Sequence, residues 1–354
     1  MSNPLELVRP DLRDFKAYEH AVFDRGLARL NANEARWRHG FDTTDSGLNV
    51  YPDPQPTALL GRLAGLYGID GVRLLLTRGS DDGIDVLCRA FCRAGQDRTV
   101  ICPPTFGMYA VSARIQGADV VEVPLSAETG FALDTDAVVT AARDGARLVF
   151  LCSPNNPTGN AITPADIADV CQGVAGRAVV VVDEAYGEFS RVPSALTLLA
   201  HHSNLVVLRT LSKAYALAGA RLGVLCGAPE LLGLLRALLP PYPVPTPSLA
   251  AAEALLEPAA LARARLEIAA TLTRRETLAE TLDSLPGVRR VWPSEANFLL
   301  VQCRNAERVM DACRERGLLL RDFSRQPALE GCLRVTVGDP AETERLVDAF
   351  EAVA

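Results

Sequence analysis

Between about residues 70 and 230, short apolar runs alternate with amphipathic stretches. The runs are continuously apolar and rich in β-branched residues, which is typical of strands buried on both faces of a sheet. They are VRLLLT, TVICPP, DVVEVPL, RLVFLCSP, AVVVVDEAY, NLVVLRTLS and RLGVLCGA. Helical spacing is found in between, at 81–93, 105–116, 134–144 and 163–173. The alternation predicts an α/β fold with a mostly parallel, seven-stranded sheet.

A proline-rich segment, PPYPVPTPS at 240–248, ends this alternation. Proline continues neither a helix nor a central strand, so the segment predicts a link between two domains. The chain then has helical spacing at 251–284 and near 305–316, and short strands near 296–302 and 332–337. We therefore expect an N-terminal segment (1–44) packed with the smaller domain, a large domain (45–245) and a smaller α+β domain (246–354).

Composition narrows the class of protein. The net charge is −7 and no basic run is present, which argues against nucleic acid or an anionic membrane as a partner. The N-terminus has no apolar segment of the secretory kind, and no stretch approaches 18 apolar residues. The nine cysteines form no CxxC, and the four histidines form no HxH or HxxxH. We expect buried free thiols, no metal site and a cytoplasmic location.

Lysine is almost absent from this chain. Of the 36 basic residues, all except Lys16 and Lys213 are arginine. Arginine cannot lose its proton and act as a nucleophilic amine, whereas lysine can. Lys16 lies in a polar segment, DFKAYEH, that suits a surface. Lys213 lies in RTLSKAYALAG, directly after an apolar run, where a surface lysine is less expected. Lys213 is therefore a candidate for amine chemistry.

Hydroxyl groups and a cation lie close to Lys213 in the sequence. Thr210 and Ser212 precede it, and Arg221 follows eight residues later. Burial and a neighbouring cation both lower the pKa of a lysine, as a Schiff-base lysine requires near pH 7. The same hydroxyls and guanidinium suit a phosphate group. The alternative is a loop lysine with ordinary helix-capping neighbours.

An acidic residue, Asp183, ends the run VVVVD and begins the segment DEAY. Open α/β sheets bind ligands at the carboxyl ends of their strands. An acid there could pair with a pyridinium nitrogen, and Tyr186 could hydrogen-bond a ring oxygen. The alternative is an aspartate that caps the next turn, although a buried charge would still need a partner.

Three further loops follow apolar runs. Residues 153–159 read SPNNPTG, a rigid loop that could hold an asparagine amide against a ring oxygen. Residues 77–83 read TRGSDDG, where a helix start offers free N–H groups to an anion if its aspartates point away. Residues 103–109 read PPTFGMY, where Tyr109 could stack on a flat ring. Each has a structural alternative: a turn, a helix cap without ligand, and a core tyrosine.

The common position of these segments favours a single site, because the carboxyl ends of parallel strands meet at one edge of a sheet. The glycine loop at 77–83 is not a Walker A loop, since no GK[ST] follows it. A dinucleotide-binding loop is not indicated either, because no GxGxxG is present. A dinucleotide-dependent dehydrogenase is therefore disfavoured.

At these residues the chain resembles the fold-type I aminotransferases that depend on pyridoxal 5′-phosphate (PLP), and among them the histidinol-phosphate aminotransferases. The resemblance runs from LNANE at 30–34 to GCLRVTVG at 331–338. Its most specific segments are TRGSDDGIDVLCRAFC, CPPTFGMY, CSPNNPTGN, VDEAY, RTLSKAYALAGARLG and LRDFSRQPALEGCLRVTVG. It implies the fold-type I architecture, PLP as cofactor and a homodimer.

The resemblance also implies roles for individual residues. Lys213 would form the Schiff base and move the α-proton, Asp183 would pair with the pyridine nitrogen, and Tyr109 would stack on the ring. Asn156 and Tyr186 would contact the ring oxygen. Phosphate contacts would come from Gly79, Ser80, Asp81, Thr210, Ser212, Arg221 and, from a second subunit, Tyr51. Substrate contacts would come from Arg334, Arg321, Tyr18 and Asn33.

The reaction implied is reversible transamination between L-histidinol phosphate and 2-oxoglutarate, giving imidazole-acetol phosphate and L-glutamate, in L-histidine biosynthesis. Three alternatives stay open. They are an aminotransferase of the same fold for aromatic or other amino acids, a PLP-dependent decarboxylase, and a non-catalytic PLP-binding module. The last would need an attached DNA-binding region, and no basic helix-turn-helix segment is present.

Overall fold

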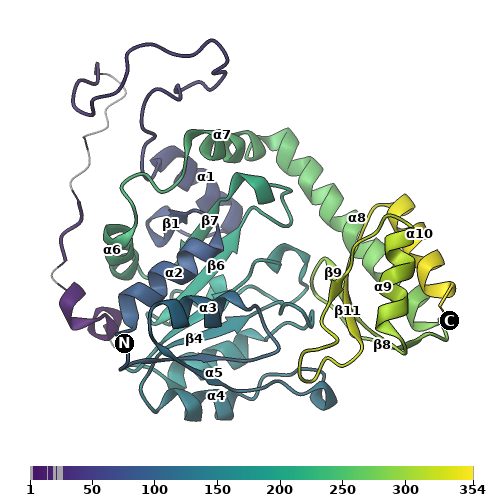
Figure 1. Cartoon of the computed structure of the whole chain (residues 1–354). Coiled ribbons are helices and arrows are strands. Elements are labelled where there is room, and N and C mark those ends of the chain that lie inside the picture. The colour runs from purple at the N-terminus through teal and green to yellow at the C-terminus, as the bar shows by residue number, and fades with distance from the viewer. Residues whose placement is uncertain (1–2, 14, 19–20, 22–26, 354) are drawn as a thin grey trace.

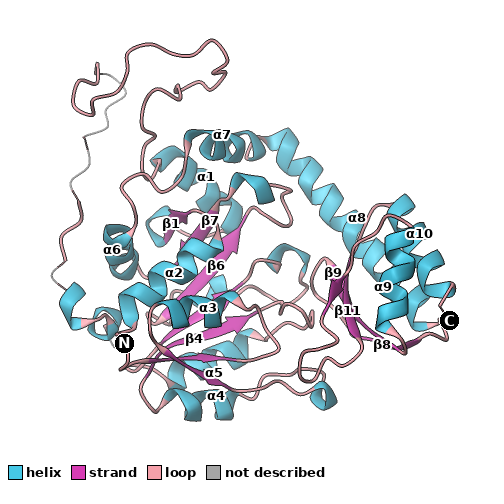
Figure 2. Cartoon of the chain, viewed as in Figure 1, coloured by secondary structure: helices cyan, strands magenta, loops and turns pink. Residues whose placement is uncertain are grey.

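The computed structural model describes residues 3–13, 15–18, 21 and 27–353. Two sheets with helices around them make up the described chain (Figures 1 and 2). The strands are β1 (Leu74–Thr77), β2 (Arg98–Ile101), β3 (Asp119–Glu122), β4 (Ala146–Cys152), β5 (Val179–Asp183), β6 (Leu205–Thr210), β7 (Gly223–Cys226), β8 (Val288–Val291), β9 (Phe298–Cys303), β10 (Arg321–Asp322) and β11 (Cys332–Thr336). The α-helices are α1 (Thr57–Tyr67), α2 (Ser80–Phe91), α3 (Met108–Ile115), α4 (Thr135–Ala142), α5 (Pro164–Gly173), α6 (Pro229–Leu238), α7 (Thr246–Leu255), α8 (Pro258–Asp283), α9 (Ala306–Glu315) and α10 (Pro340–Glu351).

The larger sheet has seven strands in the order β1-β7-β6-β5-β4-β2-β3. Strands β3, β2, β4, β5 and β6 run parallel, and β7 is antiparallel to both of its neighbours. The expected α/β architecture with a mostly parallel, seven-stranded sheet is confirmed. Because β7 runs the other way, its first residue, Gly223, lies at the same edge as Thr77 and Thr210, the last residues of β1 and β6.

Both faces of this sheet are covered, as its continuously apolar strands predict. In β5, Val180 and Val182 pack in one core with α1, α4, α5 and α7. Val179 and Val181 point the other way, into a second core with α2, α3 and α6. Alternate residues of one strand thus serve two layers, because side chains of a strand alternate between faces.

The smaller sheet is antiparallel, in the order β10-β11-β9-β8. Leu333 and Val335 of β11 pack against α8, α9 and α10. Cys332 and Arg334 alternate with them, and Cys332 packs in the core that extends from the larger sheet. This alternation turns Arg334 towards the larger unit.

Helices α7 and α8 follow the proline-rich segment and connect the two units. Leu249 and Ala252 of α7 are buried in the core of the larger unit. Pro258 lies in the first turn of α8 and separates it from α7, because proline fits the first turn of a helix but not its interior. Helix α8 then runs from the larger unit to the smaller one (Figure 1).

The first described residues, Leu7 and Val8 among them, contact the larger unit. Leu7 and Val8 are buried on the larger unit, among residues of α2 and α6. The Arg9 N–H donates to the carbonyl of Ala90, at the end of α2. These two apolar side chains complete the outer layer of the larger sheet, which explains their position.

All nine cysteines are buried and unpaired, as expected. Burial raises the pKa of the Cys152 thiol to about 12 and that of Cys303 equally, so neither is a ready nucleophile. Within the described residues, no helix has the length and apolar character needed to span a membrane.

Candidate active site

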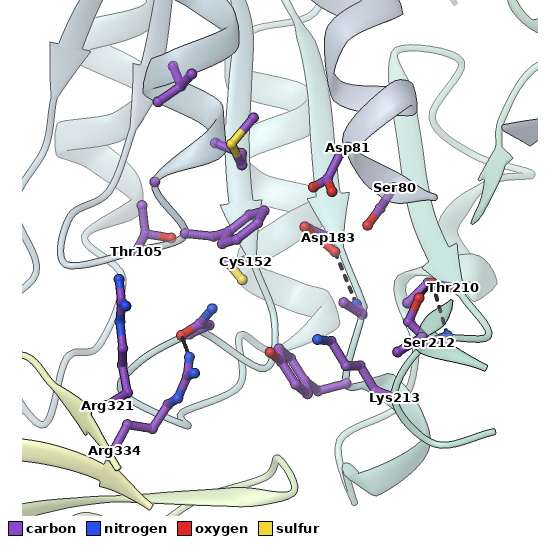
Figure 3. A pocket seen from close by; sticks show the side chains of 18 of the residues that line it. Ser80, Asp81, Thr105, Cys152, Asp183, Thr210, Ser212, Lys213, Arg321 and Arg334 are labelled. Atoms are coloured by element: carbon purple, nitrogen blue, oxygen red, sulfur yellow. Dashed lines mark hydrogen bonds between the residues drawn. The ribbon is translucent and has the colours of Figure 1, made fainter. Parts of the chain in front are cut away.

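A cleft of about 600 Å³ opens where the carboxyl edge of the larger sheet meets β10 and β11 of the smaller one. This volume lies in the range of small-molecule sites. Thr210, Ser212 and Lys213 line one side of the cleft, and Arg321 and Arg334 line the other (Figure 3). The structure thus brings together residues that are more than 100 positions apart in the sequence.

Lys213 follows the end of β6, and its side chain lines the cleft. Desolvation lowers its pKa, and the charges of Arg334 and Arg221 lower it further. Asp81 and Asp183 oppose this shift to a smaller extent. The side chain is exposed to the solvent of the cleft, yet enough protein surrounds it to favour the neutral amine. A neutral amine is what a lysine needs to act as a nucleophile.

Asp183, the last residue of β5, is 3% exposed. Its carboxylate accepts hydrogen bonds from the Tyr109 hydroxyl at 2.8 Å and from the Ala185 N–H at 3.0 Å. Burial raises the pKa of Asp183 to about 6, although both hydrogen bonds act in the opposite direction. None of the ion pairs among the described residues includes Asp183. A buried acid of this kind suits a cationic ligand atom at the cleft.

Tyr109 does not line the cleft, contrary to its expected stacking on a bound ring. It is fully buried, stacks on Phe150 at 4.8 Å, and its hydroxyl points at Asp183. Tyr109, Ser112 and Ala113 are the buried residues of α3 and lie on one helical face, because residues three and four apart are neighbours. The ring that lines the cleft is Phe106, in the loop before α3. Helical periodicity, applied to 105–116, could have revealed this difference.

The start of α2 forms the end wall of the cleft. Gly79 is its N-cap, with a φ of +80° that favours glycine, and the backbone N–H groups of the first turn have no intrahelical partner. Gly223 permits the contact of β7 with this turn, since a Cβ there would lie 2.5 Å from the Ser80 nitrogen. Ser80, Asp81 and Arg221 line the cleft around this helix start, which therefore suits an anion.

The two aspartates of this turn have different partners. Asp82 accepts the Arg78 N–H at 3.0 Å and so turns back to its own loop. Asp81 lines the cleft and pairs with Arg221, with Nη2 and Oδ2 3.2 Å apart. Asp82 therefore points away from the cleft, whereas Asp81 faces it, and both are acids of the first turn of α2. An anion in the cleft would have to replace Asp81 as the partner of Arg221.

Tyr186 and Asn156 lie between the two sides of the cleft. Tyr186 packs edge to face on Phe298 of the smaller unit, and the Lys213 Nζ lies 5.8 Å from its ring centre. Burial raises the pKa of Tyr186 to about 12, so its hydroxyl keeps its proton. Asn156 Oδ1 accepts a hydrogen bond from Arg334 Nη1 (Figure 3). This bond joins the SPNNPTG loop to the smaller sheet.

Arg321 and Arg334 are direct cross-strand partners in the β10–β11 pair. Like charges at such positions repel each other. Neither has a carboxylate partner among the ion pairs of the described chain, and desolvation and Arg321 lower the pKa of Arg334. Arg334 lies 5.2 Å from the ring centre of Phe298, which supports its position. The pair is therefore well suited to an anionic substrate group.

Three expected contact residues lie away from this cleft. Tyr18 is 73% exposed and lines a separate groove with Arg236. Asn33 is exposed, in the segment that loops outward beyond α1 and α7 (Figure 1). Tyr51 is half exposed and stacks on Tyr242 at 4.4 Å. Tyr18 and Asn33 are not among the residues that line the cleft.

Other residues of the cleft were not identified from the sequence. Cys152, at the end of β4, is the register partner of Asp183 and lies under the cleft floor. Gln326 lines the substrate side near the two arginines. The strand end was a usable signal for Cys152, because ligand sites occupy strand ends. Gln326 lies in an irregular loop, so no periodicity points to it.

Comparison with known proteins agrees with this geometry. The family model described as aminotransferase class I and II matches residues 28–350. A histidinol-phosphate aminotransferase of Stenotrophomonas maltophilia (strain R551-3) is 48% identical over 352 residues, which cover 98% of this chain and 96% of that protein. One from Xanthomonas euvesicatoria pv. vesicatoria (strain 85-10) is 48% identical over 354 residues, covering 99% and 97%. The structure of histidinol-phosphate aminotransferase from Sinorhizobium meliloti in complex with pyridoxal-5′-phosphate has a TM-score of 0.76 and 26% identity, covering 86% of this chain and 82% of that one.

Proposed function

The chain belongs to the class I and II aminotransferases, and from this premise we propose that it catalyses reversible transamination between L-histidinol phosphate and 2-oxoglutarate. Relatives named for the first of these substrates are 48% identical to it over nearly its whole length. The observation that carries the proposal is one cleft that joins Lys213, the buried Asp183 and a helix start to the paired Arg321 and Arg334. The products would be imidazole-acetol phosphate and L-glutamate, within L-histidine biosynthesis.

The donor groups of the cleft fit pyridoxal 5′-phosphate. Asp183 offers a buried carboxyl without an ion-pair partner, the start of α2 with Arg221 offers an anion site, and Phe106 offers an aromatic face. When bound, this cofactor supplies an aldehyde that condenses with amines and a pyridinium ring that withdraws electrons from the substrate's α-carbon. These three features lie around one amine, that of Lys213, which is the group that would hold the cofactor.

We assign proton transfer to Lys213 Nζ. The Lys213 amine would accept the proton from the substrate's α-carbon and hold it for return. Its lowered pKa increases the share of the neutral, basic form relative to an ordinary lysine. Arginine could not do this, which explains why lysine persists here in a chain that otherwise uses arginine.

Asp183 would bind the protonated ring nitrogen. A cation beside the carboxylate lowers the pKa of Asp183 from its raised value and keeps the acid ionised. The Tyr109 hydroxyl and the Ala185 N–H would fix the orientation of the carboxylate. The Tyr186 hydroxyl and the Asn156 amide would hydrogen-bond the ring oxygen.

The phosphate would lie at the start of α2. The N–H groups of Ser80 and Asp81 and the helix dipole favour negative charge there. Gly79 keeps the backbone open, and Thr210 and Ser212 add hydroxyls. The guanidinium of Arg221 would move from Asp81 to the phosphate, which is the stronger acceptor.

Substrate recognition is assigned to Arg334 and Arg321. Each substrate would bring an anion to these two arginines: glutamate a carboxylate, and histidinol phosphate its phosphate. Planar guanidinium groups accept both shapes in two-point hydrogen bonds. The cross-strand repulsion between the two arginines would be relieved by either anion.

We also infer a cytoplasmic homodimer in which Tyr51 contacts the cofactor phosphate of the other subunit. Half of the Tyr51 surface is exposed, and it lies outside the cleft of its own chain. Residues 45–245 would act as the large domain, 246–354 as the small one, and 1–44 as the N-terminal segment.

A half-reaction tests the proposal. The purified protein should carry PLP and show the visible absorption band of a Schiff base on lysine. Titration with L-histidinol phosphate should remove this band at far lower concentration than titration with phenylalanine. A preference for phenylalanine would support the aromatic aminotransferase instead, and release of carbon dioxide would support a decarboxylase.

The two lysines provide a matched pair of variants. Lys213→Ala should abolish the band and turnover, whereas Lys16→Ala, which changes the other lysine, should retain both. Borohydride reduction followed by peptide mass spectrometry should place the pyridoxyl label on Lys213. A label on Lys16, or bound and active cofactor in the Lys213→Ala protein, would overturn the assignment.

A further inference from the structure

We propose that Arg209 is a positioning residue for the reaction, and that it fixes the Asp183–Tyr186 turn relative to Lys213. The inference rests on the proposed function. It concerns Arg209 and its two partners, Glu184 and Glu188, which are not among the residues that line the cleft. Arg209 is the only charged residue in β6, the strand that leads directly to Thr210, Ser212 and Lys213.

The geometry is that of a buried clamp. Arg209 Nη1 donates to Glu184 Oε2 and Nη2 donates to Glu188 Oε1, both at 2.6 Å. These two glutamates flank Tyr186, and Glu184 directly follows Asp183. One guanidinium therefore ties two points of the loop after β5 to the end of β6. It joins the part of the site that would hold the ring nitrogen and oxygen to the part that carries the amine.

Burial makes this clamp rigid. The side chains of Arg209, Glu184 and Glu188 are only 7%, 5% and 8% exposed. Glu184 has further donors, the Ser194 hydroxyl at 2.5 Å and the Ala195 N–H at 2.6 Å. Gly187 permits the approach, since a Cβ there would lie 2.5 Å from Arg209 Nη1. An ion pair in such surroundings has few alternative arrangements.

The clamp also protects the charge of Asp183. Burial is the main cause of the raised pKa of Asp183, and repulsion by Glu184 adds a smaller part; Arg209 is the cation that pairs with Glu184. The other titratable groups that face the clamp are Tyr67 on α1, Tyr215 after β6 and Cys226 on β7, and burial keeps each of them neutral. Loss of Arg209 would thus shift both the place and the charge state of Asp183.

The test uses the PLP-loaded enzyme and Arg209→Lys, which keeps a positive charge but cannot bond both glutamates in the same plane. The control is Arg93→Lys. Arg93 makes a two-point pair with one buried carboxylate, that of Asp97, at 2.7 and 2.9 Å, before β2 at the opposite edge of the sheet, although its own side chain is 35% exposed. Both variants should lose thermal stability. Only Arg209→Lys should lower kcat, by about tenfold or more, with the KM for L-histidinol phosphate changed less than about twofold.

A second measurement distinguishes a positioning role of Arg209 from a contribution to protein stability alone. The pH midpoint of the bound cofactor's absorption change should move by about half a pH unit or more in Arg209→Lys and stay in place in Arg93→Lys. Unchanged kcat and midpoint in a folded Arg209→Lys protein would overturn the proposal. If that variant does not fold, Glu188→Ala removes one arm of the clamp, and it must show the same two changes or the proposal fails. An inactive wild-type enzyme would instead refute the proposed function.

Discussion

At the scale of single residues, burial moves two key groups towards their neutral forms. It lowers the pKa of Lys213, where the cations Arg334 and Arg221 add to the effect. It raises the pKa of Asp183 to about 6, because the carboxyl is 3% exposed and has only two neutral hydrogen-bond donors. A neutral amine is useful by itself, whereas the acid becomes useful only when a cation arrives beside it.

Asp183 should therefore oppose folding when no cofactor is bound. Its folded pKa, about 6, lies above the ordinary aspartate value of 3.8, so the folded state holds the proton more tightly and stability falls as pH rises from about 4 to 6. At pH 7 the cofactor-free Asp183→Asn protein should be more stable than wild type, by on the order of 3 kcal/mol at most. The difference should vanish near pH 4 in urea unfolding. Equal stability at both pH values would contradict the raised pKa.

At the scale of elements, the anion site depends on how closely β7 packs on the start of α2. β7 is antiparallel to β1 and β6, which places Gly223 at the edge where those two strands end. The absence of a side chain at Gly223 lets the backbone of residues 79 and 80 lie against it. Two strands and a helix thus form the phosphate end of the cleft together.

Gly223→Ala should displace this helix start. A Cβ 2.5 Å from the Ser80 nitrogen forces the backbone to move, at a cost of about 1–3 kcal/mol. PLP affinity, measured by equilibrium dialysis, should fall by about tenfold or more. Gly219→Ala is the matched control, because no atom lies within 4 Å of a Cβ there. If both variants bind PLP equally, β7 does not set the shape of the site.

At the scale of the whole molecule, the cleft is completed by parts that are far apart in the chain. The smaller sheet contributes Arg321 and Arg334, and contacts such as the Glu295 N–H to the Gly159 carbonyl at 2.7 Å hold it against the larger unit. The segment 27–50 loops outward and carries exposed apolar side chains, including those of Trp37 and Phe41. A second subunit would cover this segment.

Subunit mixing tests whether Tyr51 acts across a dimer. Tyr51→Ala and Lys213→Ala should each be weakly active or inactive at limiting PLP. Each mixed dimer would regain one intact site, so an equal mixture that exchanges subunits should recover about a quarter of wild-type activity. Recovery would not occur if Tyr51 acted on the cofactor of its own chain. Light scattering should confirm the dimer before and after mixing.

Local sequence patterns determined much of this molecule. Apolar runs predicted the seven strands, because a strand buried on both faces has to be apolar throughout; the edge strand β3, which is partly exposed, departs from this rule. The position of polar residues at strand ends predicted one cleft, since the topology of a parallel sheet brings those ends together. The scarcity of lysine singled out Lys213, because an amine that can lose its proton has no substitute.

Only the tertiary structure decided which side chains line the cleft and which are buried behind its surface. Phe106 lines the cleft and Tyr109 orients Asp183 from behind, a choice set by the packing of α3 on the sheet. Asp81 and Asp82 are adjacent and chemically alike, yet Asp82 accepts the N–H of Arg78 in its own loop, whereas Asp81 pairs with Arg221, which is far away in the sequence. The clamp of Arg209 likewise depends on tertiary structure, because it joins β6 to the loop after β5. Partners of charged groups follow from long-range packing, which a sequence pattern with a short period does not encode.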